Sequence, residues 1–94
     1  MMDQRLLTEQ LMKDIQEYSS LMFSRDEIAE ILELQSDDFS EMLDTNDDAY
    51  KALRKGRLIQ EAKLRKAIFD LAANGSSPAQ TLAAAMITDA KMTD

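Results

Sequence analysis

The chain has 94 residues, with 11 Lys and Arg against 18 Asp and Glu, which gives a formal net charge of −7 at pH 7. It contains neither Cys nor His, so disulfides, thiolate nucleophiles and the usual ligand sets for zinc, copper and haem are excluded. We therefore expect a protein that is not an enzyme and that has no metal and no cofactor. A chain of this length predicts a single domain, residues 1–94, with a modest core.

The composition predicts an all-α fold. Hydrophobic residues make up 45% of the chain and charged residues 31%, while aromatic residues reach only 5% and valine does not occur. Strands favour β-branched and aromatic residues, whereas Leu, Ala, Met, Glu and Lys favour helices. The first four residues lack a basic leader, and no apolar run is long enough to span a bilayer. From this we expect a cytoplasmic protein that does not contact a membrane.

Apolar spacing and capping residues predict about five helices, of which the first three lie in the first half of the chain. Leu7, Leu11, Ile15 and Tyr18 recur at three- and four-residue intervals and predict a helix over about residues 3–20. The run from Ser24 to Glu27 has the form of a capping box and starts the second helix, which ends near residues 33–35. Ser36 is the expected N-cap of a short third helix, over about residues 36–43.

The second half of the chain predicts an antiparallel hairpin of two helices. Asn46 is the expected cap of a long helix that runs from Ala49 to about Ala73, and Asn74-Gly75 ends it as a left-handed C-cap. Ser77 and Pro78 are expected as N-cap and first residue of the last helix. Because the connection is short, the two helices are expected to be antiparallel. Residues 1–45 thus form a helix-turn-helix region, and residues 46–92 a hairpin that serves oligomerisation.

Gly56 lies in the interior of the long predicted helix, where glycine costs about 1 kcal/mol relative to alanine. Three explanations are open: close packing against another helix, a bend, or a tolerated defect. We favour close packing.

Charge is segregated along the chain. From Asp26 to Asp48 there are ten acidic residues and no basic one, whereas from Lys51 to Lys66 there are seven basic residues and one acid, Glu61. One interpretation is that both segments are solvated faces that pair with each other within a subunit or between subunits. The other is that the long helix presents a basic strip to nucleic-acid phosphates. The candidate phosphate contacts are Lys51, Arg54, Lys55, Arg57, Lys63, Arg65 and Lys66, with Arg25 as a further addition.

Residues 24–43 fit a helix-turn-helix motif. Ala29 is the small residue expected where the second helix crosses the first, and the surrounding apolar residues have the expected spacing. Glu33 stands where the turn commonly carries glycine, so we expect a turn that is either strained or differently shaped. In a DNA complex, the recognition helix would contact bases through Ser36 and Ser40. The acidic residues beside these serines would be repelled by the negatively charged DNA. The alternative is that the apolar residues only form a three-helix core and that the third helix does not bind in a DNA groove.

The motif and two further segments together resemble the small subunits of phage terminases and related prophage-encoded helix-turn-helix proteins. These segments are Ala49-Tyr50 followed by Lys55-Gly56-Arg57, and the run from Leu71 to Gln80. The resemblance covers about residues 23–87. It implies a non-enzymatic protein that recognises double-stranded viral DNA, assembles into a ring and presents the DNA to a large terminase subunit.

Two hypotheses follow from these observations. The first is a DNA-binding protein of the small terminase kind that forms a homo-oligomer and whose affinity for DNA falls steeply with salt. The second is a helical protein–protein interaction or oligomerisation module, in which the acidic surface of residues 26–48 docks on a basic partner and no DNA is bound.

Overall fold

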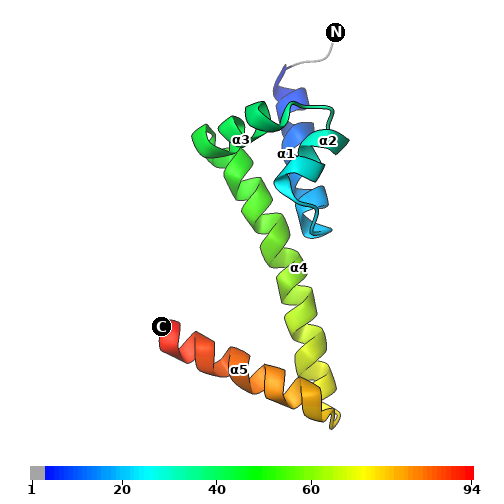
Figure 1. Cartoon of the computed structure of the whole chain (residues 1–94), viewed down its shortest axis with the longest axis vertical. Helices are drawn as coiled ribbons and strands as arrows, with labels where there is room; N and C mark the ends of the chain where they lie inside the picture. Colours follow the sequence, from blue (N-terminus) through cyan, green and yellow to red (C-terminus); the bar gives the residue numbers. More distant parts are fainter. Residues whose placement is uncertain (1–3) are drawn as a thin grey trace. The chain divides into compact units, whose positions relative to one another are not determined.

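The computed structural model describes residues 4–94, and the side chains from Thr8 onward. The described residues form helices and no strand, so the predicted all-α class is confirmed. In chain order (Figure 1), the helices are α1 (Gln4–Ser20), α2 (Arg25–Ile31), α3 (Ser36–Thr45), α4 (Asp47–Ala73) and α5 (Ser77–Thr93).

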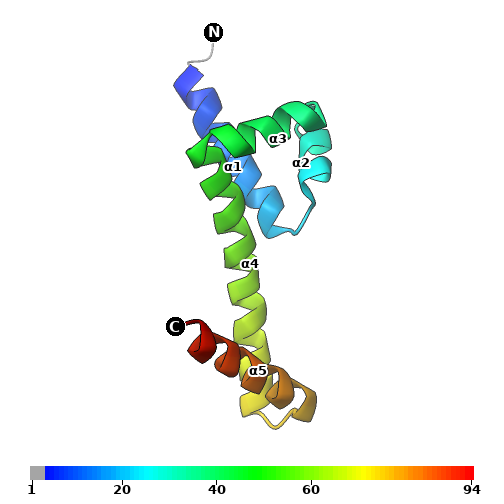
Figure 2. The same cartoon turned by 60° about the vertical axis from the view of Figure 1, so that its left-hand side comes forward.

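The chain folds as two compact units that divide within α4. The first unit ends at Gln60, and the second comprises Glu61–Asp94. The first unit therefore holds α1, α2, α3 and the beginning of α4, and the second holds the end of α4 together with α5 (Figure 2). The sequence placed the end of the helix-turn-helix region earlier, at the turn before α4.

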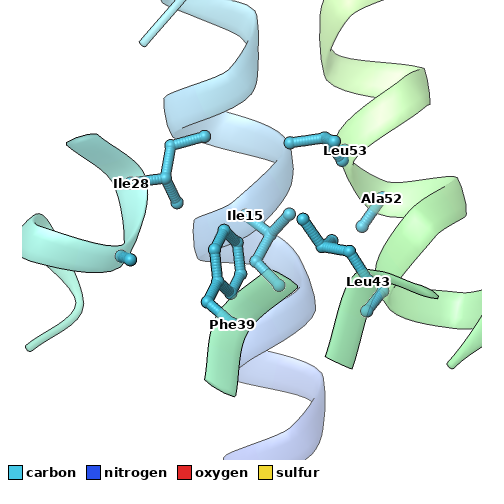
Figure 3. Packing of buried hydrophobic residues seen from close by; sticks show 8 residues of the cluster. Ile15, Ile28, Phe39, Leu43, Ala52 and Leu53 are labelled. Carbon is cyan, nitrogen blue, oxygen red and sulfur yellow. The ribbon is translucent and has the colours of Figure 1, made fainter. Parts of the chain in front are cut away.

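The core of the first unit is built from all four of its helices. Ile15 of α1, Ile28 of α2 and Phe39 of α3 are at most 1% exposed, and their side chains converge in Figure 3. Burying an aliphatic or aromatic side chain of this size contributes roughly 1.5–3 kcal/mol each. The remaining buried members are Ala29, Leu43, Ala49, Ala52 and Leu53.

At Gly56, α4 packs tightly against α1, which confirms the predicted close packing. A Cβ atom at this position would overlap Ser19 Oγ and the backbone carbonyl oxygen of Gln16, and would lie 3.0 Å from the Ser20 nitrogen. Ser19 is fully buried, and its hydroxyl donates a hydrogen bond to the Gln16 carbonyl over 2.9 Å. This bond satisfies the only buried polar side chain among the described residues.

The helix starts follow local capping chemistry. The predicted capping box of α2 is present: Glu27 N–H donates to Ser24 Oγ, and Ser24 N–H donates to Glu27 Oε1 over 2.9 Å. The Ser24 backbone N–H, and after it the Ser24 hydroxyl, donate to the Glu27 carboxylate and hold the pKa of that carboxyl below its usual value. Asn46 caps α4 as predicted, since Asp48 N–H and Ala49 N–H both donate to its side-chain oxygen.

Two predicted caps were wrong by one residue. The N-cap of α3 is Gln35, which makes no side-chain capping bond. Ser36 is the first residue of the helix, and its hydroxyl donates to Asp26 Oδ1 of α2. The N-cap of α5 is Ser76 rather than Ser77, and its hydroxyl accepts from Ala79 N–H over 3.4 Å. Pro78 still lies in the first turn, where its missing N–H costs no helical bond.

Three helices end in the same left-handed turn. The residues at these turns are Met22 (φ 67°), Glu33 (φ 58°) and Gly75 (φ 99°). In each turn the N–H of the following residue bonds to a carbonyl five residues earlier, as Leu34 N–H does to Ala29 O over 2.8 Å. Of the two expectations for the turn at Glu33, the structure shows the strained one, since Glu33 is left-handed and an L side chain is unfavourable there.

Candidate nucleic-acid interface

The bases at the start of α4 share one face of the helix. Lys51, Arg54 and Lys55 are three and four residues apart, so their side chains project from the same side, and we call this set the basic row. The buried residues of this part of α4 lie on the other side and pack on the core; they are Ala49, Ala52, Leu53 and Gly56. Core packing therefore forces the basic row to face away from the core.

No residue that the structure describes neutralises the charges of the basic row. All three side chains are exposed, and none forms an ion pair with a residue that the structure describes. Arg57, which was predicted with them, is half-buried and lies outside the row, although it too lacks an ion pair among the described residues. Exposed, unpaired ammonium and guanidinium groups on adjacent turns are the features that a phosphate backbone contacts.

The three predicted bases in the second unit differ from one another in their surroundings. Lys63, Arg65 and Lys66 are all exposed. Arg65 Nη2 lies 2.8 Å from Glu61 Oε1 one turn earlier, so its charge is partly compensated. Lys63 and Lys66 form no ion pair among the residues that the structure describes.

Arg25, the remaining predicted phosphate contact, lies in the acidic part of the first unit. It is the first residue of α2, and its Nη1 is 3.9 Å from Asp44 Oδ1 of α3. Both side chains are largely exposed, so the pair is weak. The structure brings Arg25 toward α3 and into the surface that carries the most carboxylates.

The helix-turn-helix packing is as the motif requires. Ala29 is 1% exposed, and Phe39 and Leu43 of α3 are buried beside it in the core. Ala29, the small residue that the sequence analysis singled out, thus lies in the same core as the buried residues of α3.

The exposed side of α3 is negatively charged, like DNA itself, and lacks the basic side chains that would bind DNA. Ser36 is exposed, but its hydroxyl is occupied by Asp26, and Ser40 is half-buried. Asp37, Asp38 and Glu41 are exposed beside them, and we call these three residues the acidic row. Carboxylates in this position repel phosphates, so α3 is poorly suited to enter a groove.

Of a pocket, a metal-binding cluster and a helix able to span a membrane, only a pocket is present among the described residues. A pocket of about 240 Å³ in the first unit is lined by Lys13, Gln16, Glu17, Ser20 and Ile59, and it lies beside the contact between Gly56 and α1. It was not predicted, because nothing in the spacing of α1 and α4 indicates which residues meet. The residues that the structure describes contain no cluster of side chains suited to hold a metal ion. None of the described helices is long and apolar enough to cross a membrane.

No family model, curated protein or solved structure matches the chain.

Proposed function

We propose that this chain is a non-enzymatic DNA-binding protein that contacts duplex phosphates through the basic row of α4. The observation that carries the proposal is that Lys51, Arg54 and Lys55 are exposed on one helix face and unpaired with any described residue. Arg57, Lys63 and Lys66 are further cations of the same helix that form no ion pair with a residue of the described part of the chain. Neutralising phosphates releases counterions, which drives binding without base contacts.

By its resemblance to small terminase subunits, we further propose that the protein acts on viral DNA during packaging, in the cytoplasm, together with a large terminase subunit. The helix-turn-helix core then positions α4, and the acidic α3 does not read the groove. Exposed apolar side chains of the second unit support a homo-oligomer, since Leu64, Leu71 and Leu82 are each more than half exposed. Leu64 and Leu71 are seven residues apart and so lie on one side of α4, and an exposed apolar strip commonly marks a protein–protein contact.

Fluorescence anisotropy with a labelled duplex, measured over a series of salt concentrations, tests the proposal. The affinity of the wild-type protein for DNA is expected to fall steeply with salt. In a plot of log association constant against log salt concentration, each phosphate contact is expected to contribute a slope of about −0.9. Replacing Arg54→Glu together with Arg57→Glu is expected to abolish binding, because two attractions become repulsions.

The matched control is Lys13→Glu with Lys91→Glu, which changes the net charge equally but lies outside α4. It is expected to retain most of the affinity. The proposal is wrong if the wild-type protein fails to bind duplex DNA at low salt, or if the control loses as much affinity as the α4 variant.

A further inference from the structure

The first unit carries two oppositely charged helix faces of similar spacing. In the acidic row, Asp37 and Glu41 lie one helical turn apart, on the side of α3 away from Phe39 and Leu43. In the basic row, Lys51 and Lys55 lie one turn apart on α4. A four-residue step along a helix is about 6 Å, so the charges in the two rows repeat at the same interval.

The acidic row and the basic row of one chain form no ion pair with each other. The acidic residues between positions 26 and 48 form a single ion pair among the described residues, that of Asp44 with Arg25 over 3.9 Å. Phe39 and Leu43 hold α3 against the core, and Ala52 and Gly56 do the same for α4. Because both helices turn their apolar sides inward, both charged rows face outward and remain unpaired.

We propose that the acidic row of one copy docks on the basic row of a second copy, and that this contact competes with DNA for the same lysines and arginine. A second copy is the partner whose charge and spacing the structure itself supplies. Two chains of net charge −7 repel each other overall, and an acidic face that meets a basic one offsets this repulsion at the contact. The competition with DNA depends on the proposed function, but the contact between copies does not.

The contact can form in two ways. Two copies can pair reciprocally, each acidic row on the other's basic row, or each copy can use its two rows toward different neighbours, in which case the contact is heterologous and extends to further copies. Exposed ion pairs are individually weak and are screened within about 10 Å at 0.1 M salt. The association is therefore expected at low ionic strength and lost at high ionic strength.

A charge-reversal experiment with the full chain tests the contact. The first variant carries Asp37→Lys and Glu41→Lys, and the second carries Lys51→Glu and Lys55→Glu. Sedimentation velocity at low salt is expected to show self-association of the wild-type protein, and a loss of at least about tenfold in affinity for each variant alone. An equimolar mixture of the two variants is expected to associate again, because each reversed row then faces its opposite charge.

The control variant, Asp70→Lys with Asp89→Lys, gives the same change in net charge as the first variant but lies in the second unit. It is expected to associate like the wild-type protein. Far-UV circular dichroism and thermal melting check that each variant folds. If the first variant does not fold, Asp37→Asn with Glu41→Gln replaces it and is expected to show a smaller loss in the same direction.

The results separate this proposal from the proposed function. The contact between copies is refuted if the wild-type protein sediments equally at low and high salt, if a reversal leaves association intact, or if mixing restores nothing. Binding to labelled duplex DNA is the second measurement. The first variant is expected to retain DNA binding and the second to lose it, and excess DNA is expected to dissociate the wild-type assembly. If mixing restores association but no protein binds DNA, the contact stands and the DNA-binding function fails.

Discussion

Gly56 shows how a single missing side chain determines the packing of the first unit. It lies beside Ser19 and the Gln16 carbonyl, where no Cβ atom fits. Glycine in a helix interior lowers helix stability by about 1 kcal/mol relative to alanine, so Gly56 by itself destabilises α4. Close approach of α4 to α1 compensates for that penalty, because it brings Leu53 and Ile15 into the same core.

We expect Gly56→Ala to destabilise the protein by about 1–2 kcal/mol. The gain in helix propensity is about 1 kcal/mol, but overpacking typically costs about 1–3 kcal/mol, and here part of the clash is with backbone that cannot rotate away. Urea denaturation followed by circular dichroism measures the change. Adding Ser19→Ala removes one of the clashes and is expected to recover only part of the loss, because the Gln16 carbonyl remains. A Gly56→Ala protein as stable as the wild type would contradict this account of the contact.

At the scale of the helix, the left-handed ends show where the sequence carries strain. Three ends have this geometry, yet only that of α4 has the glycine that suits it. After α1, the turn at Met22 is supported by an edge-to-face contact of Tyr18 with Phe23, whose ring centroids are 6.4 Å apart. After α2, the turn at Glu33 has no comparable aromatic pair among the described residues.

We expect Glu33→Gly to stabilise the protein by about 1 kcal/mol, because a left-handed L residue costs about 1–2 kcal/mol and glycine does not. Thermal and urea denaturation measure the gain. Glu33→Ala is the matched control, since it removes the same carboxylate but keeps the Cβ atom that causes the strain. Equal stabilisation by both substitutions would show that charge, and not backbone geometry, is responsible.

At the scale of the whole molecule, the two units differ in how much they bury. The first unit has a core of eight buried residues from four helices. In the second unit, Glu61–Asp94, the buried residues are Ala79 and Ala83, while Phe69, Leu71 and Ile87 remain at least 40% exposed. So little burial is typical of a segment that depends on further contacts for its stability.

We expect amide hydrogen exchange in α5 to be faster than in α2 and α3, by about tenfold or more in protection at low protein concentration. The reason is that α5 buries two small side chains, whereas α2 and α3 bury Ile28 and Phe39. Mass-spectrometric exchange at two protein concentrations measures this. If self-association covers the second unit, protection of α5 rises with concentration while that of the core helices does not. Strong protection of α5 at high dilution would contradict the prediction.

The candidate site could be predicted in part. The seven bases of residues 51–66 were identified from the sequence, and the structure shows that Arg65 is paired with Glu61 while Lys51, Arg54 and Lys55 share a face. The interaction of Ser36 with Asp26 was missed, because it joins two helices whose contact is not visible in the local pattern. Ser36 was expected to be the cap of α3, whereas it is the first residue of that helix.

The sequence by itself determined the helical class, the approximate limits of the five helices and an atypical turn at Glu33. These features depend on propensity, capping and handedness, which act within one or two helical turns. Only the tertiary structure decided that Gly56 is a contact with α1 and that the acidic and basic rows stay apart. Both depend on which helix faces the core buries, and burial brings together residues that are distant in the chain.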